Sequence, residues 1–510
     1  MNVFQRTVEA KRIIDNPSTE GLRQFAQHDE RTTEYGSASY TSKVRNRSAK
    51  KTYIVEDGVT VGVQQQGIPL DRAMELLAQV REYLKGREVI QIDRWIGLTP
   101  GHRLHGRLYI TAEYARIAHM WHQTLFPHDG TGTPDLMSIF VPEWPERIIF
   151  VHPKHRLTCI LGTDYFGESK KSFLRMTMYA AKQQGGIGLH AGSKVLRVRD
   201  RSGSLQDVGF ILFGLSGTGK TTLTVHDHGL VAPERVIIRQ DDVVSMDEHG
   251  ICYGTEQGFY IKTEGLTPKQ KVLYDAATRQ SAIFENVKVD EDGRVDFLNT
   301  ELTTNGRGII LRPEVAGTDE SIDLEKAHKV IFITRRQDIV PPVVKLTPEQ
   351  ASAFFMLGES IETSAGDPTR AGQAKREVGT NPFVIGPEFE EGNRFLEILH
   401  ENPDIECYLL NTGSVGAKQG FPGEKITIEV STTIMKEIAR GTITWTQDPE
   451  WGYWLPRQIE GVDLERYTPS RYYPDADYHA MSQKLRSERQ AWLAQFSGLD
   501  HEIVEVMEEG

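Results

Sequence analysis

The sequence has few cysteines and no long apolar run, and these absences narrow the classes of protein to consider. Its three cysteines, Cys159, Cys252 and Cys407, are widely spaced and form no Cys-x-x-Cys pair. Such usage favours buried structural thiols in a reducing compartment, so we expect a cytoplasmic protein. The first residues contain no apolar stretch typical of a signal peptide, and no run approaches the ~18 apolar residues of a membrane helix. We therefore expect neither export nor a membrane partner.

An excess of basic residues is also missing. The chain has 59 Lys and Arg against 71 Asp and Glu, which gives a formal net charge of −12. This balance argues against a nucleic-acid partner and predicts that any recognition of phosphate is local. The 510 residues are enough for two or three domains with ample cores.

One motif stands out, the stretch FGLSGTGKTT at residues 213–222. It fits G-x-x-x-x-G-K-[ST], it follows an apolar segment (Val208–Phe213) that predicts a buried strand, and a helix can begin after it. In such a loop the backbone N–H groups surround phosphate oxygens, Lys220 reaches the β- and γ-phosphates, and the Thr221 hydroxyl holds Mg²⁺. The alternative is an ordinary glycine-rich turn. The predicted nucleotide contacts here are Gly214, Leu215, Ser216, Gly217, Thr218, Gly219, Lys220, Thr221 and Thr222.

Two acidic residues follow the next expected strand, Val236–Arg239. Asp241 and Asp242 stand at the end of a strand that comes after a phosphate loop, where a metal-binding carboxylate belongs. The alternative for an isolated Asp-Asp pair is a turn.

Periodicity and turn residues predict other elements along the chain. The basic stretch Lys43–Lys51, taken on charge alone, favours a solvated loop over a site. Residues 358–386 are rich in Gly, Ser, Thr and Pro, which predicts a mobile lid or a disordered segment. The helices expected from apolar spacing are Val8–Ile14, Thr19–Gln27, Leu70–Leu84, Thr111–Leu125 and Leu485–Phe496.

Several separated segments together resemble ATP-dependent phosphoenolpyruvate carboxykinase, over about Arg45 to Ser431. A single segment is weak evidence, but six in the family's order are strong. They are RSAKKTYIV (47–55), YFGESKK (165–171), LHAGSKV (189–195), GLSGTGKTTL (214–223), TTNGRG (303–308) and residues 410–428.

The resemblance implies one reversible reaction, in which oxaloacetate and ATP give phosphoenolpyruvate, ADP and CO₂, as in gluconeogenesis. Loss of CO₂ leaves pyruvate enolate, whose oxygen is already a nucleophile. A site for this chemistry must stabilise the enolate and align it with the γ-phosphate, which calls for cations and metal ions.

The resemblance also implies roles for single residues. Lys171, His190 and Asp242 would bind Mn²⁺, with Lys170 lowering the pKa of its neighbour, and Asp241 would hold water on the Mg²⁺ that accompanies ATP. Arg47 and Arg307 would bind the substrate carboxylate and the leaving CO₂. Tyr165 would border the CO₂ position and Ser216 would lie near the substrate. The further nucleotide contacts implied are Lys262, Arg307, Lys425 and Ser431.

The implied fold is an α/β, two-domain phosphoenolpyruvate carboxykinase-like fold, with the active site in the interdomain cleft. Residues 1–190 would form a substrate-side domain. Residues 191–510 would form the nucleotide-binding domain with the phosphate loop and the lid, in a monomer or small homo-oligomer. The chain departs from the family at Lys425, which keeps a positive charge where the family has a planar guanidinium. It is therefore a divergent member, whose adenine and ribose contacts the resemblance does not specify.

Two other functions remain compatible with the motif. A P-loop kinase acting on another acceptor would need a general base near that acceptor and no pair of arginines for a carboxylate. A catalytically decayed nucleotide-binding protein would have lost metal-binding residues, whereas every metal position that can be matched is intact.

Overall fold

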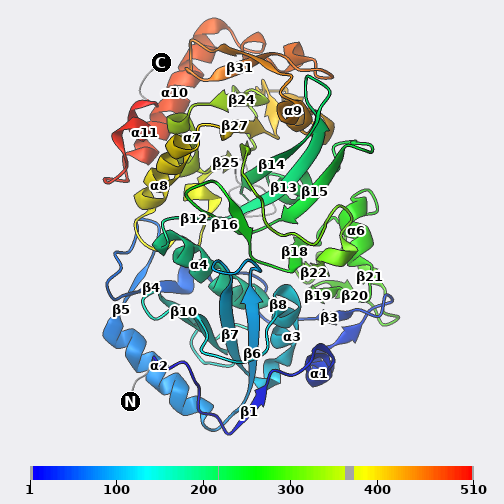
Figure 1. Ribbon diagram of the computed structural model, residues 1–510, viewed down its shortest axis with the longest axis vertical. Helices are drawn as coiled ribbons and strands as arrows, with labels where there is room; N and C mark the ends of the chain where they lie inside the picture. The colour runs from blue at the N-terminus through cyan, green and yellow to red at the C-terminus, as the bar shows by residue number, and fades with distance from the viewer. Residues whose placement is uncertain (1–3, 216, 362–372, 508–510) are drawn as a thin grey trace. The chain divides into compact units, whose positions relative to one another are not determined.

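The computed structural model describes residues 4–215, 217–361 and 373–507, which form a mixed α/β protein with several sheets (Figure 1). Its contacts divide the chain into two compact units, each assembled from separate stretches. The first unit comprises Met1–Gln183, Tyr253–Ile322 and Phe383–Pro387, and the second comprises Gln184–Cys252, Asp323–Pro382 and Glu388–Gly510.

These units differ from a single division at residue 190, because 253–322 packs with the N-terminal part of the chain. The physical reason is a shared sheet, in which Ile283–Glu285 pairs in parallel with Ala38–Tyr40. In spatial order that sheet contains β18 (Gly258–Lys262), β22 (Arg307–Leu311), β19 (Ile283–Glu285), β3 (Ala38–Tyr40) and β2 (Arg31–Thr32).

The larger sheet of the first unit has a core on each face. Helix α2 (Leu70–Leu84) buries Ala73, Leu76, Leu77, Val80 and Leu84, spaced as one helical face, in the first core. Helices α3 (Ala115–Thr124) and α4 (Phe166–Gln183) pack in the second core. Side chains alternate between the two, as period-two geometry requires. The strands in order are β1 (Arg12–Asp15), β6 (Glu88–Ile96), β7 (Leu104–Thr111), β9 (Leu136–Val141), β11 (Leu157–Leu161), β10 (Ile148–His152), β4 (Thr52–Glu56) and β5 (Gly67–Pro69), with β8 (Phe126–Pro127) beside β6.

The second unit is built on an eight-stranded sheet in which three central strands, β14 (Leu205–Gly214), β23 (Lys329–Thr334) and β27 (Glu406–Asn411), run parallel. Helices α7 (Pro348–Leu357), α8 (Glu388–Glu401) and α10 (Asp475–Leu493) share one core with this sheet, whereas α5 (Lys220–Val225) and α9 (Ile428–Arg440) contact β13 (Ala191–Arg199). The strands in order are β15 (Arg235–Gln240), β13 (Ala191–Arg199), β14 (Leu205–Gly214), β23 (Lys329–Thr334), β27 (Glu406–Asn411), β24 (Val343–Leu346), β31 (Trp454–Gln458) and β30 (Thr444–Gln447).

Most predicted elements are present, but one predicted helix is wrong and two others have different bounds. Residues 8–14 do not form a helix, because Arg12–Asp15 is a strand that pairs in parallel with β6. The helix expected at Leu485–Phe496 begins ten residues earlier, at Asp475, and the short helix α11 (His501–Glu505) follows it. The helix expected over Thr111–Leu125 is split into a 3₁₀ turn (Ala112–Tyr114) and α3.

The predicted lid is regular at both of its described ends. Strands β25 (Glu359–Ile361) and β26 (Ala374–Arg376) pair antiparallel, and a 3₁₀ turn (Val378–Thr380) follows. Residues 362–372 of this prediction lie outside the described residues.

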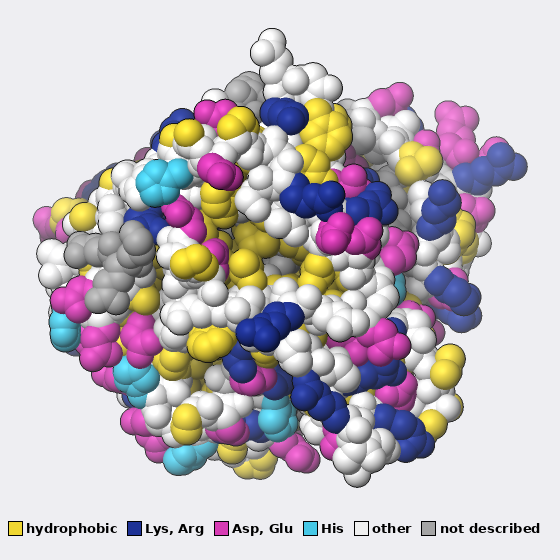
Figure 2. Space-filling view, turned by 90° about the horizontal axis from the view of Figure 1, so that it is seen from above, with side chains coloured by type: hydrophobic (Ala, Val, Ile, Leu, Met, Phe, Trp, Pro, Cys, Tyr) yellow, Lys and Arg dark blue, Asp and Glu magenta, His cyan; other side chains and the backbone are white. Residues whose placement is uncertain are grey.

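Basic and acidic side chains are mixed on the surface, with Lys and Arg interspersed among Asp and Glu over the face that Figure 2 shows. All three cysteines are free and buried, and burial raises the pKa of each thiol. Within the described ranges, no helix has both the length and the apolar character needed to cross a membrane.

Candidate active-site residues

The glycine-rich motif follows a strand and precedes a helix, as its sequence predicted. Strand β14 ends at Gly214, and α5 begins at Lys220. Gly217 and Gly219 have φ angles of 84° and 97°, a left-handed backbone that favours glycine. At Gly214 a Cβ atom would lie 2.5 Å from Oγ1 of Thr218, so this position also requires glycine.

Polar contacts hold the motif from both sides. The hydroxyl of Thr218 donates to the backbone carbonyl of Leu215 (2.8 Å). The backbone carbonyl of Thr218 accepts from Oγ1 of Thr412 (2.7 Å). Nη1 of Arg335 donates to the carbonyl of Gly217 (2.8 Å). The side chains of the first residues of α5, Lys220, Thr221 and Thr222, are half-buried. The predicted contact Ser216 lies outside the described residues.

His190 and Asp242 lie together in the second unit. Nδ1 of His190 is 2.7 Å from the carbonyl of Thr380, and Nε2 is 3.0 Å from Oδ1 of Asp242. Because a carbonyl can only accept, Nδ1 carries the proton, which leaves Nε2 directed at the carboxylate. This is how a carbonyl orients a metal-binding histidine. Asp241, the other predicted acid, is buried next to this pair.

The donor set of His190 and Asp242 suits a divalent ion. At metal–ligand bonds of about 2.1 Å, adjacent ligands of an octahedral ion are about 3.0 Å apart, which is the separation found. The same distance also suits a hydrogen bond from a protonated imidazole. An imidazole with one carboxylate is a ligand pair that transition metals accept readily.

A cluster of three cations surrounds one aromatic ring in the first unit. The guanidinium carbons of Arg47 and Arg175 lie 4.4 Å and 5.4 Å from the ring centroid of Phe383, and Nζ of Lys171 lies 5.1 Å from it. Burial, and secondly repulsion from Arg47, lowers the pKa of Arg175 to about 10. Like charges held this close are expected where an anion binds. We call Arg47, Lys171 and Arg175 with Phe383 the cation cluster.

Buried carboxylates fix the segment that carries Arg47. Asp164 accepts the backbone N–H groups of Lys43 and Val44, each at 2.8 Å. Glu168 accepts the backbone N–H of Ser48. The basic stretch is therefore a loop held at both ends next to the start of α4. Its lysines, Lys43, Lys50 and Lys51, are exposed, as its charge alone favoured, whereas Arg45 and Arg47 are half-buried.

A hydrogen-bonded network connects Tyr165 with Arg307. The hydroxyl of Tyr165 accepts from Tyr260 (3.1 Å) and from Nδ2 of Asn305 (3.2 Å). Oδ1 of Asn305 in turn accepts from Nε and Nη2 of Arg307, at 3.1 Å and 2.7 Å. Glu285 closes the network, because Tyr260 lies 3.3 Å from its Oε2. These contacts orient the guanidinium of Arg307 and the Tyr165 ring.

Burial perturbs the titration of Glu285. It raises the pKa of this carboxyl to about 7, although the backbone N–H of Phe166 donates to Oε1 at 2.9 Å. Burial also raises the pKa of Tyr260, which therefore stays a neutral donor. A protonated Glu285 can donate to Tyr260, which then donates to Tyr165.

The two adjacent lysines of α4 have different surroundings. Nζ of Lys170 forms an ion pair with Glu256 at 2.8 Å, and both side chains are almost fully buried. Lys171 is half-buried in the cation cluster. Lys170 is therefore held in a buried ion pair, whereas its neighbour faces the ring of Phe383.

The remaining predicted contacts are spread over both units. Lys262 lies opposite Arg307 in the β18–β22 ladder and forms an ion pair with Glu264. Lys425 is exposed on the short strand β29 (Glu424–Lys425). Ser431 is buried in α9, where its hydroxyl donates to the carbonyl of Thr427 at 3.2 Å.

Sequence reasoning missed several members of these groups. Arg175 was within reach, because it follows Lys171 by four residues and so lies on the same face of α4. Phe383 stands in the segment predicted as a lid, and Glu285 follows an apolar run that reads as core. Asn305 was within reach, because it belongs to the polar TTNGRG segment.

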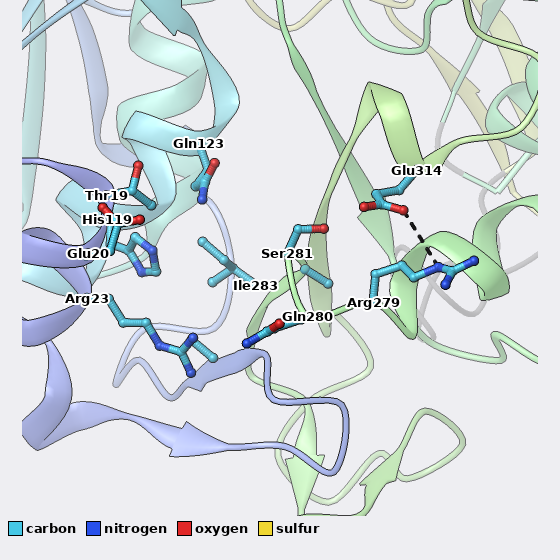
Figure 3. A pocket seen from close by; sticks show the side chains of 12 residues that line it. Thr19, Glu20, Arg23, His119, Gln123, Arg279, Gln280, Ser281, Ile283 and Glu314 are labelled. Carbon is cyan, nitrogen blue, oxygen red and sulfur yellow. Dashed lines mark ion pairs between the residues drawn. The ribbon is translucent and has the colours of Figure 1, made fainter.

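The first unit also contains a cavity of about 620 Å³, drawn in Figure 3. Its size is that of a small-molecule site. Its two arginines are already paired with carboxylates of this chain, Arg23 with Glu30 (2.6 Å) and Arg279 with Glu314 (3.7 Å). Burial lowers the pKa of His119 on its wall to about 4. The cavity is thus chemically unlike the cation cluster.

Comparison with known proteins agrees with the motifs. A family model described as phosphoenolpyruvate carboxykinase matches residues 11–465. The phosphoenolpyruvate carboxykinase (ATP) of Aeropyrum pernix is 35% identical over 486 residues, covering 94% of this chain and 93% of the relative. That of Rubrobacter xylanophilus is 30% identical over 483 residues, covering 87% and 86%.

The match extends beyond the segments that suggested it, from the first strand of the first unit into the C-terminal part of the second. It includes the cation cluster, the His190–Asp242 pair and the glycine-rich motif. The chain belongs to the ATP-dependent phosphoenolpyruvate carboxykinase family.

Proposed function

We propose that this chain converts oxaloacetate and ATP reversibly to phosphoenolpyruvate, ADP and CO₂, as a step of gluconeogenesis in the cytoplasm. The observation that carries the proposal is the cation cluster around Phe383, in a family member whose second unit contains the His190–Asp242 pair. An enzyme for an anionic keto acid and a nucleotide needs both kinds of site.

Decarboxylation requires a held carboxylate and a stabilised enolate. We assign Arg47 to the substrate carboxylate, because its guanidinium is oriented by Phe383 and by the tied segment around it. Arg307, oriented by Asn305, binds the carboxylate that leaves as CO₂ and then the γ-phosphate. Tyr165 borders the CO₂ position. The electron pair released from the C–C bond forms pyruvate enolate.

Phosphoryl transfer then depends on alignment and charge neutralisation. The backbone N–H groups of the glycine-rich motif bind the phosphates of ATP, with Lys220 and Lys262 on the transferred group. Lys425 and Ser431 lie on the base side of the nucleotide. The enolate oxygen attacks the γ-phosphorus, and ADP leaves.

Lys171, His190 and Asp242 would hold Mn²⁺, and Thr221 with Asp241 would hold the Mg²⁺ of ATP. A bound divalent ion supplies positive charge for the enolate oxygen and the phosphate. The chain's own contribution is orientation, since the Thr380 carbonyl fixes the tautomer of His190. The location of this site in a cleft between the two domains stays a prediction.

The decisive experiment incubates purified protein with Mn²⁺, Mg²⁺, ATP and oxaloacetate, and follows phosphoenolpyruvate and CO₂. We expect ATP-dependent phosphoenolpyruvate at a rate above spontaneous decarboxylation, which a protein-free reaction measures. Folded, nucleotide-bound protein that yields no phosphoenolpyruvate would overturn the proposal. GTP in place of ATP tests nucleotide choice, for which we expect a lower rate. The comparisons do not favour a kinase for another acceptor or a decayed nucleotide-binding protein.

A further inference from the structure

Two imidazoles and a carboxylate meet in the first unit, outside the residues used above. They belong to Asp57, His152 and His155, and one ligand atom from each lies within 4.8 Å of the others. We propose that these three side chains bind a borderline transition-metal ion of the Zn²⁺ class. Two histidine nitrogens and one carboxylate oxygen form a ligand set that binds Zn²⁺ in preference to Mg²⁺ or Ca²⁺, which prefer ligands that are all oxygen.

The sheet topology brings the three residues together. Strands β4 and β10 are parallel neighbours, so their carboxyl ends meet at the same edge of the sheet (Figure 1). Asp57 directly follows β4, and His152 is the last residue of β10. A turn closed by the N–H of Arg156 and the carbonyl of Pro153 (3.0 Å) returns His155 to His152.

A separate observation concerns the nitrogen of His152 that faces this cluster. The side chain is fully buried, and Nε2 has no hydrogen-bond partner within the described part of the chain. An unsatisfied buried polar atom is costly, and native structures rarely keep one without a reason. Nε2 lies 3.6 Å from Oδ2 of Asp57, too far for a good hydrogen bond. Two ligands of a tetrahedral ion with bonds of about 2.1 Å are about 3.4 Å apart, so an ion fits between them.

The side chains around the three ligands orient the imidazoles and limit the affinity for a metal ion. The Phe4 ring stacks on His155 (4.1 Å, 8°) and meets His152 edge-on (4.6 Å), which holds both imidazoles. Nζ of Lys154 contacts Oδ1 of Asp57 at 3.1 Å, so Oδ2 is the oxygen that faces His152. The ammonium repels a dication, and ligation through Nε2 also gives up the long 3.4 Å bond from the His155 N–H to Nδ1 of His152.

This site is distinct from the proposed catalytic residues of the first unit. The Arg47 segment precedes β4 and Asp57 follows it, so five residues of extended strand separate them, about 17 Å. A second acidic group with one histidine, Glu349, His400 and Glu502, is a weaker candidate. Two of its three members are exposed, and His400 is already paired with Glu349 at 2.9 Å.

The test measures Zn²⁺ binding to the full chain by equilibrium dialysis, with excess Mn²⁺ and ADP present to occupy the proposed catalytic site. We expect one Zn²⁺ per chain, bound at least ~10-fold more weakly by His155→Ala and by Asp57→Asn. The matched control is His249→Ala, an exposed histidine of the second unit, which should bind Zn²⁺ like the unmodified protein. Unchanged affinity in His155→Ala, or an equal loss in the control, would overturn the proposal.

A second variant keeps all three ligands in place. Lys154→Met removes the exposed competing ammonium, so it should bind Zn²⁺ more tightly by a few-fold. Equal or weaker binding by this variant counts against the site. Phosphoenolpyruvate formation without Zn²⁺ should be unchanged in His155→Ala, which separates this proposal from the catalytic one.

Discussion

The cation cluster of the first unit and the His190–Asp242 pair of the second hold charge in opposite ways. In the first, two arginines and a lysine share the face of Phe383, and burial makes the pKa of Arg175 fall. In the second, an imidazole with a fixed tautomer meets a carboxylate at 3.0 Å. Gathered like charges favour an anionic ligand, whereas an imidazole with a carboxylate favours a metal ion. In the proposed mechanism the arginines of the first group therefore hold the keto acid, and the second group holds the metal ion together with Lys171.

The largest effect is expected at the histidine. His190→Ala removes the proposed metal-binding nitrogen, so kcat should fall at least ~100-fold and the affinity for Mn²⁺ should fall with it. Binding of ATP without Mn²⁺ should be kept, because the glycine-rich motif is intact. Steady-state kinetics and Mn²⁺ titration measure both quantities, with His249→Ala as control. Full activity in His190→Ala would show that His190 and Asp242 do not hold the catalytic metal ion.

Replacing the adjacent lysines one at a time sharpens the comparison. Lys171→Met should reduce kcat/KM by about 100-fold with little change in the free energy of unfolding. Lys170→Met removes the ammonium that pairs with buried Glu256, which should cost about 3–5 kcal/mol of stability. Chemical denaturation and kinetics separate the two outcomes. If both variants lost only activity, the Lys170–Glu256 pair would belong to the catalytic machinery.

A smaller effect should follow from changing the shape of one cation. Arg47→Lys keeps the positive charge but loses the planar guanidinium that stacks on Phe383 and can bind a carboxylate through two bonds. We expect kcat/KM for oxaloacetate to fall about 10- to 100-fold, with the KM for ATP unchanged. Arg72→Lys, on the exposed face of α2, is the matched control. Equal activity of Arg47→Lys and the control would mean that Arg47 does not hold the substrate.

The elements and site residues that could be predicted from the sequence are those marked by a pattern within one short segment. Leu70–Leu84 is a helix with the predicted bounds, because its apolar spacing alone selects one face. Residues 8–14 failed, since only pairing with distant β6 makes Arg12–Asp15 a strand. The glycine-rich motif could be recognised for a similar reason, because its fixed residues all lie within one short segment. The helical spacing could have placed Arg175 beside Lys171, but only the tertiary fold brings Phe383 to both of them.

The smallest effect on activity is expected at Glu285, whose ionisation instead changes the pH dependence of stability. Its pKa rises from 4.5 to about 7 on folding, so between these values the folded chain keeps a proton that the unfolded chain has released. The free energy of unfolding therefore decreases as pH rises through this window, by about 3 kcal/mol, and is unaffected by this group below it. Glu285→Gln can still accept the N–H of Phe166 but cannot ionise, so it should lack this decrease. Denaturant unfolding at several pH values from 4 to 8 compares the two proteins. If the free energy of unfolding changed with pH in parallel for the two proteins, Glu285 would ionise as readily in the folded chain as in the unfolded one. A protonated Glu285 would then not supply the proton of the Tyr260–Tyr165 network.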